Sequence, residues 1–299
     1  MKKIMMMMAL AAIALFSVTA CGDDDDDNGG TKKSAVTLST PKYKNDAIKV
    51  KVPNVETTLD GKAIRLKQLE LTEGGRYLLA YEQLEENGSR MTRADALTEY
   101  LMGFFEKDGD GYKLVKFGHI AFSIEGNHYM LTLIPTGGKE IQTEVTKLAT
   151  IPASELTNYL CRTWTITNTR IQGNTGDVKV AKDFPGKCDM SELIAYAESK
   201  GITVKEKPDA SKTIVDGVTF TASQSYIVNY TSGATDVGTW HWTQQSTGTG
   251  NLAYDWDGNH MGFEAIQHTG VVTFEGSQCK LALPISDNSM TLEVVYTMQ

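Results

Sequence analysis

This chain of 299 residues lacks the residue patterns that usually carry enzyme chemistry. No serine stands in a Gly-x-Ser-x-Gly elbow, and the five histidines form neither an HExxH motif nor another paired-ligand spacing. Gly248-Thr249-Gly250 lies between expected strands rather than opening a helix, so it is not a phosphate-binding loop. Without a recognisable nucleophile, base or metal-ligand set, the sequence predicts a protein that is not an enzyme and uses no cofactor.

Cysteine is scarce, with four in the whole chain. Cys161, Cys188 and Cys279 stand far apart and show none of the short spacings that zinc sites use, so no metal is expected. An odd number of cysteines leaves at least one unpaired. Export would permit a disulfide bond, and Cys161 and Cys188 are nearest in sequence, but nothing in the sequence fixes a pairing.

Basic side chains are outnumbered, with 29 Lys and Arg against 37 Asp and Glu and a formal net charge of −8. An acidic chain with no basic stripe is repelled by phosphates, which argues against a nucleic-acid partner. The hydrophobic fraction of 41% is ordinary for a globular protein. We therefore expect a folded chain of one or two domains.

The N-terminus has the layout of a secretory signal peptide. Lys2 and Lys3 precede an apolar run over residues 4–16, and small residues follow up to Ala20. The apolar run is shorter than the ~20 residues that span a bilayer. The sequence thus predicts that residues 1–20 are a leader that is removed on export.

Val18-Thr19-Ala20-Cys21 resembles the lipobox of bacterial lipoproteins. The resemblance implies that Cys21 is lipidated, becomes the new N-terminus and holds the protein at a membrane. The alternative is an ordinary secreted protein with a chance cysteine at the cleavage site. Asp23–Asp27 follow at once; five like charges in a row stay solvated, so we expect a flexible tether over residues 21–45. This acidic run resembles the export signal of Bacteroidetes surface lipoproteins, which implies display outside the outer membrane.

Short alternating runs separated by turn residues dominate the rest of the chain and predict an all-β fold. We expect two tandem antiparallel meander units, at 46–150 and 151–299, each closed into a barrel or folded into a sandwich. A change of phase near Gln68 predicts a β-bulge. Two helices are expected, a short one over 92–101 and a clearer one over 190–200 that Asp189 would cap.

An internal repeat supports the two units. Residues 69–77 align with 218–226 at an offset of 149, and residues 124–127 align with 274–277 at an offset of 150. Alternating strands match by chance easily, but two separate blocks with nearly one offset indicate a duplication.

The second unit carries Cys161-Arg162-Thr163-Trp164, Phe220 with Tyr226, and Gly238-Thr239-Trp240-His241-Trp242. This pattern over residues 160–298 resembles the lipocalin-like domains of Bacteroidetes surface lipoproteins. It departs from true lipocalins, which have a glycine two residues before the first-strand tryptophan, and the helix at 190–200 is an insertion. The resemblance implies a barrel and carries no catalytic residue over to this chain.

Aromatic residues of the second unit are the candidate ligand contacts. Trp240 and Trp242 share one face of a strand, Tyr226 and Tyr230 share a face of the strand before it, and Trp256 follows in the next. Such residues can stack on sugars or line a small-molecule pocket. Trp240 and Trp242 would alternatively fill the barrel interior, and Trp256, close to a turn, is the better candidate for an exposed contact.

Two Asp-Gly segments, residues 108–111 and 255–259, resemble fragments of calcium loops. Neither continues to the glutamate that completes such a loop, and Asp and Gly are also common in hairpin turns. We therefore expect turns here.

Together these patterns predict a non-enzymatic surface lipoprotein of the outer membrane that binds a glycan or a small hydrophobic ligand. The alternative is a structural or adhesion lipoprotein that meets another protein through a strand edge or an apolar patch.

Overall fold

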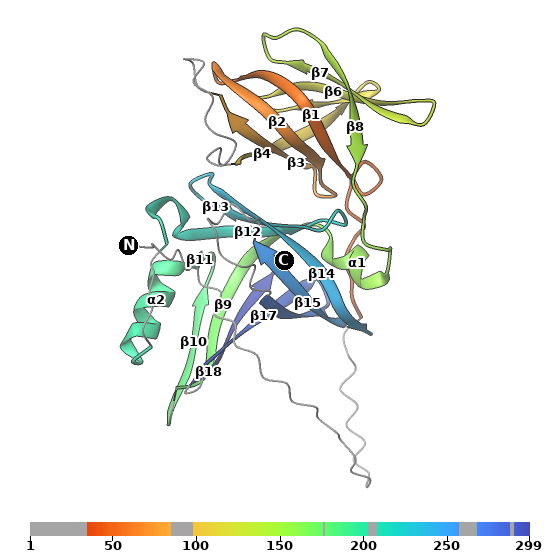
Figure 1. Ribbon diagram of the computed structural model, residues 1–299. Coiled ribbons are helices and arrows are strands. Elements are labelled where there is room, and N and C mark those ends of the chain that lie inside the picture. Colours follow the sequence, from red (N-terminus) through yellow and green to blue (C-terminus); the bar gives the residue numbers. More distant parts are fainter. Residues whose placement is uncertain (1–34, 85–97, 176, 203–207, 257–267, 288–289) are drawn as a thin grey trace.

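A computed structural model describes residues 35–84, 98–175, 177–202, 208–256, 268–287 and 290–299 (Figure 1). Within these ranges the chain is mostly antiparallel strand, arranged as two tandem eight-stranded barrels. The all-β fold with two meander units is therefore confirmed. The sequence left open whether each unit is a barrel or a sandwich, and both units are barrels. A barrel pairs every strand on both sides, which leaves the meander without open edges.

The first barrel follows the order of the sequence and closes where β1 pairs with β8, at Val50 and Lys147. Its strands are β1 (Ile48–Leu59), β2 (Lys62–Leu71), β3 (Arg76–Gln83), β4 (Glu99–Asp108), β5 (Gly111–Leu114), β6 (Gly118–Glu125), β7 (His128–Pro135) and β8 (Ile141–Lys147). Alternate side chains such as Val50, Leu69 and Leu131 are buried in its core.

The predictions made from local sequence patterns in the first barrel are partly confirmed. The register between β2 and β3 shifts between Leu66 and Gln68, so the predicted bulge is confirmed. The helix expected over 92–101 is wrong at its end, because residues 99–101 belong to β4 and pair with β3. Residues 85–97 lie outside the described ranges. The segment 108–111 is the hairpin turn between β4 and β5, as expected.

The second barrel contains one interruption in its wall. Its strands are β9 (Thr163–Thr175), β12 (Ile214–Phe220), β13 (Ser225–Tyr230), β14 (Thr235–Ser246), β15 (Thr249–Trp256), β16 (His268–Glu275), β17 (Gln278–Asp287) and β18 (Met290–Met298). β9 closes the barrel on β12 only over residues 163–165. Farther along, β9 pairs with β10 (Val178–Pro185), while the start of β12 pairs with β11 (Cys188–Asp189).

Helix α2 (Met190–Ser199) follows β11 and packs onto this interruption (Figure 1). Asp189 caps it by accepting hydrogen bonds from the backbone N–H groups of Ser191 and Glu192, so the predicted helix and its cap are confirmed. Leu193 and Ala197 are buried in the core of the second barrel. A second helix, α1 (Glu155–Leu160), was not expected; it packs Leu160 against the same core. A single 3₁₀ turn, η1 (Ala210–Lys212), precedes β12.

The first repeat block forms equivalent hairpins in the two barrels. Arg76 donates its backbone N–H to the Thr72 hydroxyl at 3.2 Å, and Ser225 donates to the Thr221 hydroxyl at 3.0 Å. The reciprocal backbone bonds, from Thr72 to Arg76 and from Thr221 to Ser225, are also present in both turns. The two turns therefore share one hydrogen-bond pattern at the offset of 149 residues.

The second repeat block forms the turns of the β6–β7 and β16–β17 hairpins. Glu125 pairs with His128, and Glu275 pairs with Gln278. Each turn contains one left-handed glycine, Gly126 or Gly276, with φ of 62° and 59°. The β10, β11 and α2 segment thus lies as an insertion between the first and second strands of the second barrel.

The segment before the first barrel runs along the second barrel. Val36 and Leu38 pack against the second-barrel core, and the Thr37 N–H donates to the Gly276 carbonyl at 3.0 Å. The chain then turns at residues 42–46 and enters β1. In the described part of the chain, neither helix has the length and hydropathy needed to cross a membrane.

Candidate functional site

One end of the second barrel is closed by tryptophans and α1. Trp240 is 1% exposed, and its indole N–H donates to the Thr221 carbonyl at 3.0 Å. Trp242, on the same face of β14, donates to the Thr157 hydroxyl of α1 at 3.0 Å. Their rings meet edge to face with centroids 5.2 Å apart. At this end, both tryptophans fill space and tie the helix to the barrel.

Four tyrosines from three strands face the interior farther along the barrel. We call Tyr226 and Tyr230 of β13, Tyr254 of β15 and Tyr296 of β18 the tyrosine cluster. Tyr226 and Tyr254 are buried with ring centroids 5.4 Å apart, while Tyr230 and Tyr296 pack against the core and are partly buried. The cluster therefore places several phenol groups among aliphatic side chains of the barrel.

Burial raises the pKa of all four phenols well above the usual range. At Tyr296 the neighbouring Cys188 thiol and the other three phenols raise the pKa further. Burial likewise raises the pKa of Cys188 to about 11. These groups are thus neutral at physiological pH and within electrostatic reach of one another. They can donate and accept hydrogen bonds but offer no charge.

The charged groups beside the cluster are already compensated. Asp236, which is buried, accepts from the Lys212 ammonium at 2.5 Å and from the Tyr230 hydroxyl at 2.8 Å. Such a pair satisfies both ions. A charged ligand would therefore find no unpaired counter-ion in these residues.

The remaining sequence candidates are placed as follows. The backbone of Trp256 pairs with Gly238 at the end of β15, but its side chain lies outside the described part of the structure, as do Cys21 and most of residues 255–259. Cys161, Cys188 and Cys279 are all buried and free. Among the described residues, no three His, Cys, Asp or Glu side chains are grouped closely enough to hold a metal ion.

Sequence reasoning identified Tyr226 and Tyr230 but assigned no ligand contact to Tyr254 or Tyr296. Both stand at inward positions of alternating strands, so the period of two was a usable signal for their face. Their approach to β13 depends on closure of the barrel, which the sequence does not specify residue by residue.

A second polar centre lies where the two barrels meet, which we call the junction. Its first-barrel side is one cross-strand row of outward residues: Lys49, Glu70, Leu78 and Met102. Its second-barrel side is a corresponding row: Thr163, Thr219, Ile227 and Val237. Leu78, Ile227 and Val237 form a buried apolar cluster, with Tyr100 and Met102 packed against it.

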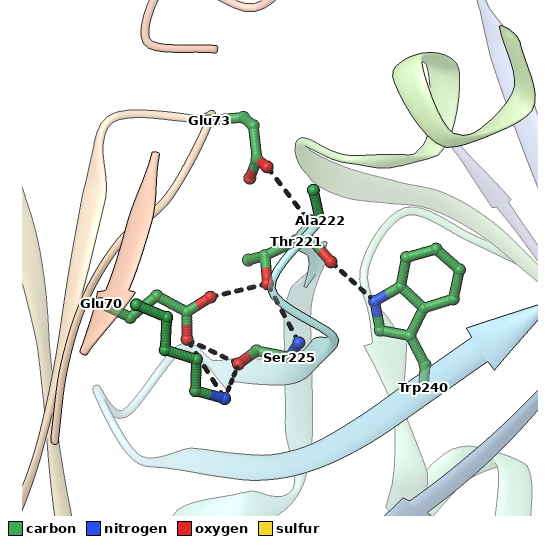
Figure 2. Close-up of polar contacts among 7 residues, drawn as sticks. Glu70, Glu73, Thr221, Ala222, Ser225 and Trp240 are labelled. Atoms are coloured by element: carbon green, nitrogen blue, oxygen red, sulfur yellow. Dashed lines mark hydrogen bonds and ion pairs between the residues drawn. The ribbon is translucent and has the colours of Figure 1, made fainter. Parts of the chain in front are cut away.

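The polar half of the junction is centred on Glu70 (Figure 2). This fully buried carboxylate accepts hydrogen bonds from the hydroxyls of Thr221 and Ser225, each at 2.6 Å. The Lys49 ammonium lies 3.7 Å from Glu70 and donates to Ser225 at 2.9 Å. One cation and two hydroxyls thus compensate the buried charge. This network joins β1 and β2 of one barrel to the β12–β13 turn of the other.

An apolar pair on the first barrel is exposed beside the junction. Phe104 is 56% exposed and Val115 is 42% exposed, and the Val115 N–H donates to the Phe104 carbonyl. The guanidinium of Arg76 lies over the Phe104 ring at 4.7 Å. These residues offer a small apolar contact surface.

No model of a known protein family matches the chain, and a search of curated proteins finds no significant match.

Proposed function

We propose that this chain is a lipoprotein of the outer-membrane surface, anchored through Cys21, whose second barrel binds a small ligand without chemical conversion. The leader and the acidic run after Cys21 support the location. The tyrosine cluster is the observation that supports ligand binding, because neutral hydrogen-bonding groups amid apolar walls are typical of small-molecule sites.

Of the two ligand classes expected, the geometry favours a small hydrophobic ligand over a glycan. Sugar recognition by stacking needs an accessible aromatic face. Trp240 is buried, and Trp242 is held by Thr157 of α1. The cluster instead offers phenols that suit an uncharged molecule with a hydroxyl or carbonyl oxygen.

A binding screen tests this function. The purified protein is titrated with Nile red, a neutral dye that carries a carbonyl oxygen, and with a panel of neutral oligosaccharides. We expect saturable dye binding that weakens roughly tenfold in a Tyr254→Phe, Tyr296→Phe double variant, because each change keeps the ring but removes a hydroxyl that could donate to the carbonyl oxygen of the dye. Tyr129→Phe, in β7 of the first barrel, is the matched control and should bind as the wild type does.

Absence of binding by the dye, or equal binding by the double variant, would count against the proposed site. Saturable binding of an oligosaccharide in place of the dye would favour the glycan class.

The alternative function, adhesion to another protein, has one specific observation in its favour. Phe104 and Val115 form an exposed apolar pair beside the junction. If adhesion is the function, a Phe104→Ser, Val115→Ser double variant displayed on cells should lose attachment to protein-coated surfaces while dye binding is unchanged. Unchanged attachment would remove this pair from consideration.

A further inference from the structure

Glu73 occupies an unusual position in the junction. It lies in the turn between β2 and β3, is 4% exposed, and its Oε1 accepts the backbone N–H of Ala222 at 3.0 Å (Figure 2). Ala222 is the counterpart of Glu73 at the repeat offset, so corresponding positions of the two turns touch. The second carboxyl oxygen, Oε2, is buried and has no hydrogen-bond partner among the described residues.

The charged groups around Glu73 do not neutralise it. Glu70, on β2, adds a like charge, and Lys44, from the segment before β1, adds an attraction from an exposed position. Lys49 on β1 is engaged with Glu70 and Ser225. Cys161, at the end of α1, contributes a thiol whose pKa burial and these carboxylates raise. An ionised Glu73 would therefore be a buried charge without an ion-pair partner.

Burial raises the pKa of Glu73 to about 7 from its ordinary 4.5. Hydrogen bonds from the backbone N–H groups of Ala222 and of Glu73 itself oppose this shift, and the charge of Glu70 reinforces it. Both the unpartnered, buried Oε2 and the raised pKa favour the neutral form of Glu73 in the docked barrels.

We propose that the junction is proton-linked: Glu73 carries a proton while the two barrels are docked, and its ionisation weakens the docking. The neutral carboxyl keeps its bond from Ala222 and places no second negative charge beside Glu70. This inference concerns how the barrels are held together and does not depend on ligand binding by the second barrel.

The direction of the effect follows from the two pKa values. The pKa of Glu73 is higher in the docked state than in the free carboxyl. The stabilisation of the docked barrels by protonated Glu73 is therefore fully present below about pH 4.5. It declines as the pH rises and is lost above about pH 7. The gap between these values corresponds to roughly a 300-fold change in the docking equilibrium.

Glu73→Gln is the decisive variant, because glutamine keeps the size and the acceptor oxygen but cannot ionise. Urea unfolding is followed by tryptophan fluorescence and circular dichroism between pH 4.5 and 8. We expect the wild type to lose stability relative to Glu73→Gln as the pH rises, and the difference to level off above pH 7.5. Glu125→Gln, an exposed carboxyl in the β6–β7 hairpin, is the control and should follow the wild type.

Hydrogen exchange separates docking from general stability. After correction for intrinsic rates, the turns at 72–76 and 221–225 should exchange faster at pH 8 than at pH 5 in the wild type, and at one rate in Glu73→Gln. If the exchange rates of these turns change with pH in the same way in the wild type and in Glu73→Gln, the proposal is overturned. If the variant does not fold, the ¹³C titration of Glu73 in the wild type decides: a midpoint near 7 supports the proposal and one below 5 refutes it.

Discussion

Lys49 shows how one residue can hold two domains together. The residue is 8% exposed, and its ammonium lies between the Glu70 carboxylate of its own barrel and the Ser225 hydroxyl of the other. Removing one partner of a buried pair leaves the other as an uncompensated charge, which costs more than the pair contributes.

Replacing Lys49 with methionine should therefore destabilise the protein by about 3 kcal/mol, because Glu70 would remain buried without a cation. Urea unfolding at pH 7 measures the loss. Lys51→Met is the matched control, since Lys51 lies two residues farther along β1 and is exposed; it should change the free energy of unfolding by less than about 0.5 kcal/mol. Equal effects of both substitutions would contradict a special role for Lys49.

Single residues could be assigned to a face from the sequence, but their partners could not. The period of two correctly placed Trp240 and Trp242 on one side of their strand. Lys49 bonds to Ser225, which lies 176 residues away. Such a contact depends on how two finished barrels dock, and no local pattern encodes it.

Among the elements, the seam between β9 and β12 is the weakest part of the second barrel wall. Three residue pairs close it, and Gly217 lies in the first of them. A Cβ atom at Gly217 would lie 2.3 Å from the Trp164 carbonyl oxygen. Because that atom belongs to the backbone, the two strands would have to separate to accommodate it.

Gly217→Ala should therefore destabilise the second barrel by about 2–3 kcal/mol. All four tryptophans, Trp164, Trp240, Trp242 and Trp256, belong to this barrel, so tryptophan fluorescence reports on it selectively. Gly111→Ala is the control: it creates a comparable contact, 2.3 Å from the Ile120 carbonyl oxygen, but in the first barrel. We expect Gly217→Ala to lower the midpoint of urea unfolding, followed by fluorescence, more than Gly111→Ala does. The reverse order would contradict the inference that the β9–β12 seam is the weakest part of the second barrel wall.

The elements were predictable where local signals agreed. The helix over 190–200 has a capping aspartate, an apolar stripe and Gly201 after its end, and the structure contains it. Residues 92–101 also showed a capping residue and apolar spacing, yet their last three residues begin β4 and pair with β3. Neighbouring strands override weak helix propensity there. Strand β8 gives a weak signal in the sequence because polar and charged residues dominate it.

For the molecule as a whole, the turns and alternation predicted the fold class, and the repeat predicted two similar units. The sequence did not distinguish a barrel from a sandwich, because both bury one face of every strand. It also gave no indication that counterpart turns of the two units, around Glu73 and Ala222, would meet. The proposed ligand site was predictable in its aromatic character only.

The proposed anchoring belongs to the same scale and has a direct test. In Cys21→Ser the acceptor sulfur for the lipid is gone, so we expect the protein to leave the outer-membrane fraction. The wild type should remain there and should be cleaved by protease added to intact cells. Lys33→Ser, in the same polar segment, is the control and should fractionate as the wild type does. Retention of Cys21→Ser in the membrane would contradict lipid anchoring at this residue.

Val36, Thr37 and Leu38 contact the second barrel, so anchoring at Cys21, as proposed, would place the second barrel nearer the membrane than the first. Although the chain would be held at its N-terminus, its C-terminal barrel would lie next to the membrane and its N-terminal barrel would lie farthest from it. Antibodies against the β6–β7 hairpin should then reach cells more easily than antibodies against the second unit. The part of this protein that other cells and molecules encounter first would be the barrel without tryptophan.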